Sequence, residues 1–283
     1  MTEPTASEQP SRAPTGQPVV VAMERAPDHR AATRWAAREA LRRGVPLRVA
    51  ITNGQDAGSF TATRTTASDV APGLRIEALP IRGPVDTGLP ELSADVGLVV
   101  LPASVPEVSA VVSQAYCPVA VVPDTEPTVN RPIVLGAAPW TAENVYETAF
   151  RVATERHAPL HAVRLWNDPL IDLGRLLPGH IAEFDATDAQ LTRELDIALS
   201  TWVANYPSVT VKTLIVNDDA TAGLVVLTHR AQLLVLGRSV RGATLARLLG
   251  SPVDTVVHRS RCPVLVVPSD GPPRQRWLPK ATR

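Results

Sequence analysis

The residues best suited to chemistry gather in one glycine- and arginine-rich loop near the end of the chain. The loop reads GRSVRGATLARLLGSPVD, residues 237–254, and begins at the end of the apolar run LLVLG. Glycines allow a backbone to approach phosphate oxygens closely, and the free N–H groups at a helix start attract anions. The arginines could neutralise phosphate charge or stay solvated. The loop is therefore a candidate phosphate cradle, although Ser251 and Pro252 are equally a plain N-cap and first turn of a helix.

Elsewhere the sequence offers little catalytic or metal-binding chemistry. The six histidines have no metal-ligand spacing, and no GxSxG elbow, Walker A lysine or CxxC pair occurs. Asp218 and Asp219 precede the segment ATAGLVVLTHR, which is typical of a helix N-terminus. We therefore predict no catalytic residues and no metal site, and we expect that the protein is not an enzyme.

Composition argues against several classes of partner. Lysine plus arginine and aspartate plus glutamate both number 28, so the formal net charge is zero and neither nucleic acid nor a membrane surface is indicated. No apolar run reaches the length of a transmembrane helix, and residues 1–17 lack the apolar core of a secretion signal. Two cysteines do not make a disulfide framework. These features predict a cytoplasmic protein with a disordered tail at 1–17.

An internal repeat sets the domain organisation. YCPVAVVP (116–123) and RCPVLVVP (261–268) are offset by 145 residues, and RRGVPLRVAI (42–51) is echoed by ERHAPLHAVR (155–164). A repeat of this length predicts two domains built alike. We place the domains at 18–125 and 132–268, the linker at 126–131 and a basic tail at 269–283.

Each repeat alternates β-branched apolar stretches with helical patterns, which predicts a parallel sheet covered by helices on both faces. The second half has an additional helical stretch near 183–205, whereas the first half has only a short polar segment, 53–69, at that place. The fold class is thus α/β, with two tandem doubly wound sheets. The expected strands lie near 18–24, 46–52, 73–79, 97–101, 118–122, 132–138, 160–166, 209–216, 232–237 and 263–267.

This arrangement resembles the universal stress protein family. The resemblance lies in the strand–helix–strand start, the LLVLG strand, the glycine loop and the closing CPVLVV strand. It implies a Rossmann-like fold with strand order 3-2-1-4-5 in each half and a non-catalytic role in the stress response. It also implies a pseudo-dimer in which strands 118–123 and 263–268 pair antiparallel, and it allows a further homodimer of whole chains. Antiparallel pairing would hold Cys117 and Cys262 at opposite ends, beyond disulfide reach, as buried free thiols.

In the nucleotide-binding members of that family, a loop of pattern G-x2-G-x9-G-[ST] wraps the ribose and phosphates. An aspartate at the end of the first strand contacts the adenosine, and a backbone position at the end of the second strand contacts adenine. Here Gly237, Gly250 and Ser251 keep the outer frame of the loop, Val240 replaces its middle glycine, and an alanine replaces the aspartate. The resemblance therefore implies a partial site for ATP with Mg²⁺, made by Gly237, Arg238, Ser239, Gly250, Ser251, Pro252, Leu165 and Ala138 (Ala137 in a shifted register).

The first half departs further from the family pattern. Glu24 holds the acidic position, but LVVLP (98–102) runs almost directly into the helix EVSAVVSQAYC, which leaves no room for a phosphate loop. Nucleotide binding is therefore expected in the second half only. The main alternative is a nucleotide-independent interaction scaffold whose pocket has filled, and a slow ATPase is the least favoured hypothesis.

Overall fold

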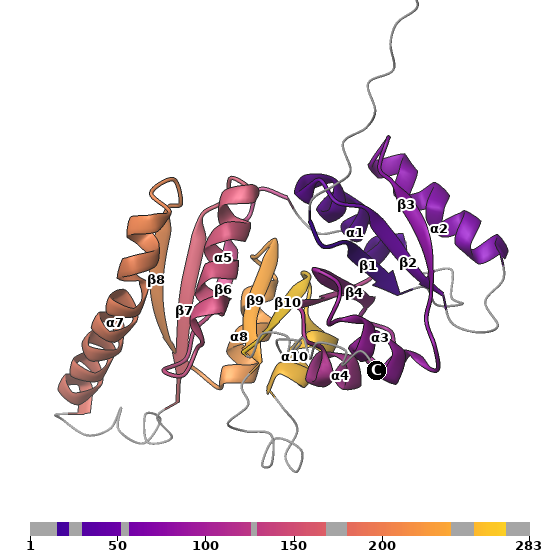
Figure 1. Ribbon diagram of the computed structural model, residues 1–283. Helices are drawn as coiled ribbons and strands as arrows, with labels where there is room; N and C mark the ends of the chain where they lie inside the picture. Colours follow the sequence, from indigo (N-terminus) through magenta and orange to yellow (C-terminus); the bar gives the residue numbers. More distant parts are fainter. Residues whose placement is uncertain are drawn as a thin grey trace, which may run out of the picture.

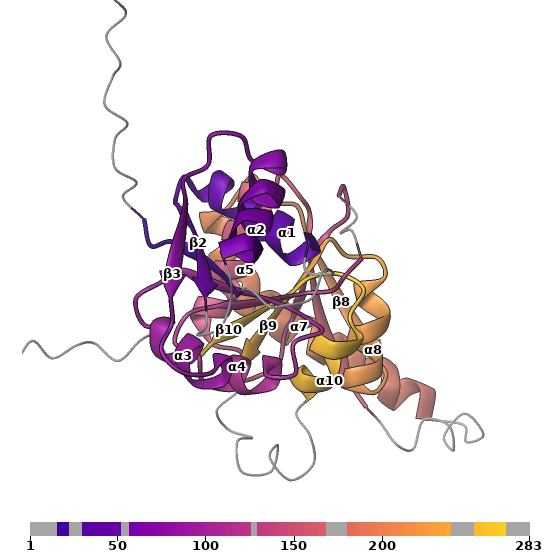
Figure 2. The ribbon, with the colours of Figure 1, turned by 90° about the vertical axis from the view of Figure 1, so that its right-hand side faces the viewer.

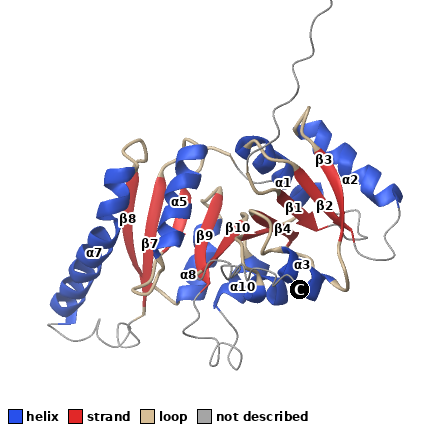
Figure 3. Ribbon diagram, in the orientation of Figure 1, coloured by secondary structure: helices blue, strands red, loops and turns tan. Residues whose placement is uncertain are grey.

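The computed structural model describes residues 16–22, 30–51, 57–125, 129–167, 180–238 and 252–269. They form one continuous ten-stranded sheet with helices on both faces (Figure 1, Figure 3). Within these ranges, no helix combines the length and the apolar character needed to span a bilayer. Most of the two predicted tails and residues 126–128 of the predicted linker lie outside the described residues.

All ten strands occur where the apolar stretches predicted them. Across the sheet their order is β3-β2-β1-β4-β5-β10-β9-β6-β7-β8, so each half has the order 3-2-1-4-5 counted from its outer edge. Neighbouring strands within a half are parallel. The strands are β1 (Val19–Ala22), β2 (Leu47–Ile51), β3 (Ile76–Pro80), β4 (Leu98–Pro102), β5 (Val119–Val122), β6 (Ile133–Gly136), β7 (Leu160–Trp166), β8 (Val211–Asn217), β9 (Leu233–Arg238) and β10 (Val264–Pro268).

The two halves meet along one antiparallel seam between β5 and β10. Val121 lies opposite Val264, and Val119 lies opposite Val266. Cys117 and Cys262 precede the two strands, so the antiparallel register places them towards opposite ends of the seam. Both are buried free thiols, as predicted, and burial raises the pKa of each to about 12.

The helices divide into two layers, one on each face of the sheet (Figure 2). On β1, Val19 and Val21 pack into one layer while Val20 and Ala22 pack into the other, which explains why the strands are apolar throughout. The first layer contains α1 (Arg30–Arg43), α2 (Ala57–Val70), α5 (Glu143–Glu155) and α7 (His180–Asn205). The second contains α3 (Val85–Leu92), α4 (Val108–Gln114), α8 (Ala220–Thr228) and α10 (Pro252–Arg259).

One expectation from the sequence was wrong. The segment 53–69 was predicted to be only a short polar connection, but most of it forms α2, the counterpart of α7. From Ser59 to Val70 the segment contains neither proline nor glycine, so nothing breaks a helix there. Ala67 is fully buried, and Phe60 packs against the core. Tertiary packing therefore outweighs the modest helix propensity of its threonines.

Charged side chains also join the halves in the layer of α1 and α5. Glu39 of α1 is 1% exposed, and its carboxylate accepts a hydrogen bond from Arg156 of the second half at 2.9 Å. Arg42 and Arg43 of α1 bond the same carboxylate. The Arg156 guanidinium lies 5.5 Å from the ring centroid of Trp35, in cation–π range. These residues, which we call the Glu39 cluster, link the two halves on the face of the sheet that α1 and α5 cover.

Candidate functional site

The carboxyl ends of β9, β6 and β7 lie side by side in the second half. Gly136 is level with Val163 on one side and with Leu236 on the other. The strand ends that follow, Ala137–Ala138, Arg164–Leu165 and Gly237–Arg238, therefore reach the same edge of the sheet. Ligands of doubly wound folds bind at such an edge, where the strand order reverses. The structure thus brings Ala138, Leu165 and Gly237 to the same edge of the sheet.

Ala138 opens a tight turn into α5. Its N–H donates to the hydroxyl of Thr141 at 2.8 Å, and its carbonyl accepts from the Thr141 N–H at 3.0 Å. Trp140 stands at the tip of the turn and is 60% exposed. Local bonds therefore already satisfy both backbone groups of Ala138, and its methyl side chain adds no charge.

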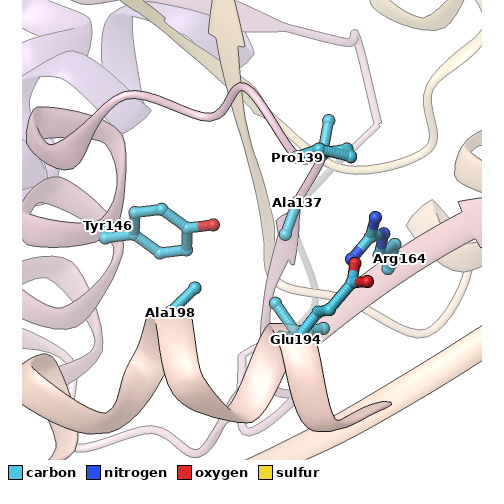
Figure 4. A pocket seen from close by; sticks show the side chains of 8 residues that line it. Ala137, Pro139, Tyr146, Arg164, Glu194 and Ala198 are labelled. Carbon is cyan, nitrogen blue, oxygen red and sulfur yellow. The ribbon is translucent and has the colours of Figure 1, made fainter. Parts of the chain in front are cut away.

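A cavity of about 160 Å³ opens beside this turn (Figure 4). Tyr146 enters it from α5, Arg164 from β7, and Glu194 from α7. Arg164 donates to the Glu194 carboxylate at 2.9 Å. The described residues that line the cavity are Ala137, Ala138, Pro139, Tyr146, Arg164, Glu194, Leu195 and Ala198.

Two ionisable groups of the cavity have shifted pKa values. Hydrogen bonds from Gln190 and Arg164 lower the pKa of Glu194, so it is a carboxylate at neutral pH. Burial raises the pKa of Tyr146, which keeps the phenol neutral and able to donate a hydrogen bond. The cavity therefore offers one anionic acceptor, one guanidinium and one phenol.

The sequence did not predict Tyr146, Glu194 or their neighbours on α7. It placed a helix near 183–205, but the face of that helix that meets the strand ends depends on how α7 packs on β8 and α5. A regular apolar stripe along residues 183–205 would have identified the face of the helix that meets the strand ends. Leu195 and Leu199 do face the core, while Ile197 between them is 73% exposed.

Gly237 lies close to α5 in this structure. A Cβ atom built there would lie 3.0 Å from a methyl group of Val145, on α5. Its φ is not in the left-handed region. The close approach of α5 to β9 therefore gives a packing reason for a glycine at this position.

Arg238 bonds the first half of the chain. Its guanidinium donates to the carbonyl of Val112 at 3.0 Å and to that of Ala115 at 2.7 Å, at the C-terminal end of α4. Carbonyls at a helix end lack intrahelical partners and attract cations. The sequence suggested Arg238 as a phosphate ligand, and the structure places it instead as a cap that joins the two halves.

Leu165 is half-buried and packs in the second layer. A Cβ atom at Gly223 of α8 would lie 2.1 Å from a Leu165 methyl group, so the two residues are in tight contact. Asp219 is the N-cap of α8, as predicted, and its carboxylate accepts from the N–H groups of Thr221 and Ala222. The acidic pair is thereby accounted for by helix capping.

Part of the predicted site lies outside the described residues. Ser239, Val240, Gly250 and Ser251 of the loop, and Glu24 of the first half, lie outside the described residues. Pro252 is the first residue of α10. In the first half, five residues (103–107) separate β4 from α4, against thirteen (239–251) between β9 and α10. Over the ranges that the structure describes, no cluster of His, Cys, Asp and Glu could hold a metal ion.

Comparison with known proteins gives the same family for the second half. Residues 130–268 match the family model described as "Universal stress protein family". A curated universal stress protein of Mycobacterium tuberculosis is 33% identical over 164 residues, which cover 56% of this chain and 54% of the relative. Another from the same organism is 36% identical over 172 residues, covering 57% and 53%. The chain therefore spans about half the length of the curated relatives it matches.

Solved structures share the fold over most of the chain. A universal stress protein from Archaeoglobus fulgidus matches with a TM-score of 0.61 and 14% identity, covering 90% of this chain and 99% of that one. A functionally unknown protein from Pseudomonas aeruginosa matches with a TM-score of 0.61 and 15% identity, covering 90% and 94%. At this identity the likeness shows the fold alone.

Proposed function

We propose that the protein is a non-catalytic stress-response module of the cytoplasm whose second half binds an adenine nucleotide. Residues 130–268, which match the universal stress protein family model, support this proposal. The observation that carries the proposal is the cavity at the carboxyl ends of β6 and β7, which Ala138 lines. It lies in the half that matches the family, at the edge of the sheet where such folds take ligands.

The ligand would be ATP with Mg²⁺, and its parts would divide between the cavity and the loop. A volume of about 160 Å³ is below the usual range of pockets that enclose a whole small ligand. The adenosine would therefore occupy the cavity beside Ala138 and the Leu165 backbone, and the phosphates would extend towards the loop. The residues proposed for the loop side are Gly237, Ser239, Gly250, Ser251 and Pro252.

The proposal that the protein is not catalytic rests on the structural roles of its charged and nucleophilic side chains. Asp219 caps α8, and Arg238 caps α4. Both thiols are buried, with pKa values near 12, and are therefore poor nucleophiles at neutral pH. The domains would be residues 18–125, a structural partner, and residues 132–268, the nucleotide-binding unit.

Thermal unfolding with ATP and Mg²⁺ tests the binding. A ligand at 100 times its Kd should raise the free energy of unfolding by about 2.7 kcal/mol. Ala198→Leu, which narrows the cavity from α7, should reduce this gain. Ala204→Leu on the exposed side of α7 is the matched control and should leave the gain unchanged. Absence of any stabilisation of the natural protein by ATP would reject nucleotide binding.

The second candidate function is a nucleotide-independent scaffold, and Arg238 favours it because its guanidinium holds α4 rather than facing a ligand. Arg238→Met distinguishes the two. On the scaffold hypothesis it lowers stability by about 2 kcal/mol, through the loss of charged hydrogen bonds, and ATP has no effect on either protein. On the nucleotide hypothesis the variant is destabilised but still gains stability from ATP.

A further inference from the structure

Helix α1 carries a row of arginines on the face that points away from the core. Residues four apart lie on one side of a helix, and the row, which we call the arginine stripe, consists of Arg30, Arg34, Arg38 and Arg42. The helix contains five arginines and one glutamate, so its charge is +4 in a chain whose formal net charge is zero. That glutamate is Glu39, which is buried in the Glu39 cluster. The outer face of α1 is therefore strongly basic.

The corresponding face of α5 has the opposite charge. The repeated segments RRGVPLRVAI and ERHAPLHAVR make residue 155 the counterpart of residue 42, an offset of 113. The counterparts of the arginine stripe are Glu143, Glu147, Arg151 and Glu155. Helix α5 contains three glutamates and one arginine, so its charge is −2. The described side chains of α7 add three carboxylates and one arginine, whereas α2 has one of each sign. The first layer is thus basic in the first half and acidic in the second.

The seam fixes how these two faces lie relative to each other. Strands β5 and β10 pair antiparallel, and α1 and α5 lie on the same face of the sheet (Figure 2). The halves are therefore related by an approximate two-fold axis perpendicular to the sheet, with α1 and α5 antiparallel on either side of it. Each row spans twelve residues, or about 18 Å of helix.

Only one way of laying a second copy on the first layer brings opposite charges together. Turning the copy over about an axis parallel to the strands places each α1 antiparallel to the α5 of the other chain. Arg38 then faces Glu147, and the ends of the stripe face Glu143 and Glu155. Turning it about an axis across the strands places α1 on α1, with arginines against arginines.

We propose that two copies of this chain associate face to face through the first layer, with the arginine stripe of each against the acidic face of α5 in the other. A second copy fits as the partner because one chain carries both charges, on helices of matching length and spacing. The association needs this surface, since β5 and β10 already pair with each other within the chain. Leu41 of α1, which is 49% exposed, lies on the same face.

Sedimentation velocity of the full chain measures the association. The natural protein should be a dimer at about 0.1 M salt, where charges act over about 10 Å, and should dissociate at about 1 M, where they act over about 3 Å. Arg38→Glu and Glu147→Arg should each raise the dimer Kd at least about tenfold, because a two-fold dimer contains the contact twice. Arg259→Glu is the matched control: it reverses an exposed arginine of α10, in the second layer, and should leave the Kd unchanged.

An equimolar mixture of the two variants separates recognition from a structural effect. Each variant alone sets like charges against each other at both contacts. In a pair made of one Arg38→Glu chain and one Glu147→Arg chain, opposite charges meet at both contacts, so the mixture should associate with a Kd close to the natural one. A change that acted within a single chain could not be rescued by mixing, and the unfolding midpoint of each variant monitors its folding.

Several results would overturn the proposal. The natural protein could stay monomeric at about 0.1 M salt, neither reversal could change the Kd, or the mixture could fail to associate. Vesicles that contain phosphatidylserine test another occupant of the stripe. If the protein binds them, and Arg38→Glu abolishes this binding while Glu147→Arg does not, the arginine stripe serves an anionic surface instead of a second copy.

Discussion

Replacing Arg156 by methionine should destabilise the protein by about 3 kcal/mol, although the residue lies far from the candidate site. Arg156 follows α5 in the second half, and its guanidinium bonds the buried carboxylate of Glu39 in the first half. Methionine keeps much of the apolar contact of the arginine stem and removes the charge. The change therefore isolates the electrostatic link between the halves.

The magnitude follows from the surroundings of Glu39. Removing one partner of a buried ion pair costs about 3–5 kcal/mol when the remaining charge is left alone. Arg42 and Arg43 still bond Glu39 in the variant, which favours a cost below that range. The lost cation–π contact with Trp35 adds about 0.5–2 kcal/mol. Together these contributions give about 3 kcal/mol.

Urea unfolding at pH 7, followed by tryptophan fluorescence, measures the loss. Arg151→Met is the matched control: it removes a partly exposed ion pair with Glu155 from the same helix and should cost less than about 0.5 kcal/mol. The double variant Glu39→Gln with Arg156→Met should be less destabilised than the sum of its single changes. Equal losses for Arg156→Met and Arg151→Met would refute the reasoning.

The same cluster predicts a dependence on pH. Burial raises the pKa of Glu39, but Arg156, Arg43 and Arg42 together outweigh it and hold the pKa below its usual value. The folded state then binds the proton less tightly than the unfolded state. The stabilisation from Glu39 is complete above the ordinary carboxyl pKa and is lost as pH falls through the lowered one. The stability difference between the natural protein and Arg156→Met should therefore shrink in acid.

Two substitutions and one labelling experiment test the packing and the thiols. Asp219→Ala should cost about 1 kcal/mol, because two amide N–H groups of the first turn of α8 lose their acceptor; urea unfolding measures it, and a change within error would contradict the cap. Gly237→Ala should cost about 1–3 kcal/mol through the contact with Val145, and a neutral result would mean that α5 can move away from β9. Cys117 and Cys262 should react with a thiol reagent only after unfolding, since burial raises the pKa of both to about 12, whereas fast labelling of the native protein would refute their burial.

The sequence predicted the sheet because its signals were local. Ten apolar stretches coincide with ten strands, and residues such as Val19 and Val20 are buried on opposite faces, which explains why the stretches are continuous. The α2 helix was missed because its stability depends on the contacts of Phe60 and Ala67 with the core, and such contacts cannot be read from propensity.

The candidate site was only partly predictable for the same reason. Parallel strands end at a common edge, so the order of the strands was enough to place Ala138, Leu165 and Gly237 together. The partners of Arg238 are 123 and 126 residues away in sequence, and no local pattern points to them. Glu194 reaches the cavity only because α7 packs across β8.

The two halves present different side chains to each other where they meet. The repeat offset of 145 residues makes Ser109 of α4 the counterpart of Asp254 of α10. In a symmetric dimer of identical subunits each residue near the axis faces its own copy, so an aspartate there would meet another aspartate. Here Ser109 donates a hydrogen bond to the Asp254 carboxylate, and His258 lies 3.4 Å from the same hydroxyl. The Ser109–Asp254 contact thus pairs a donor with an acceptor, and Arg156 and Glu39 provide opposite charges across the other face. The two halves therefore meet through complementary side chains on both faces of the sheet.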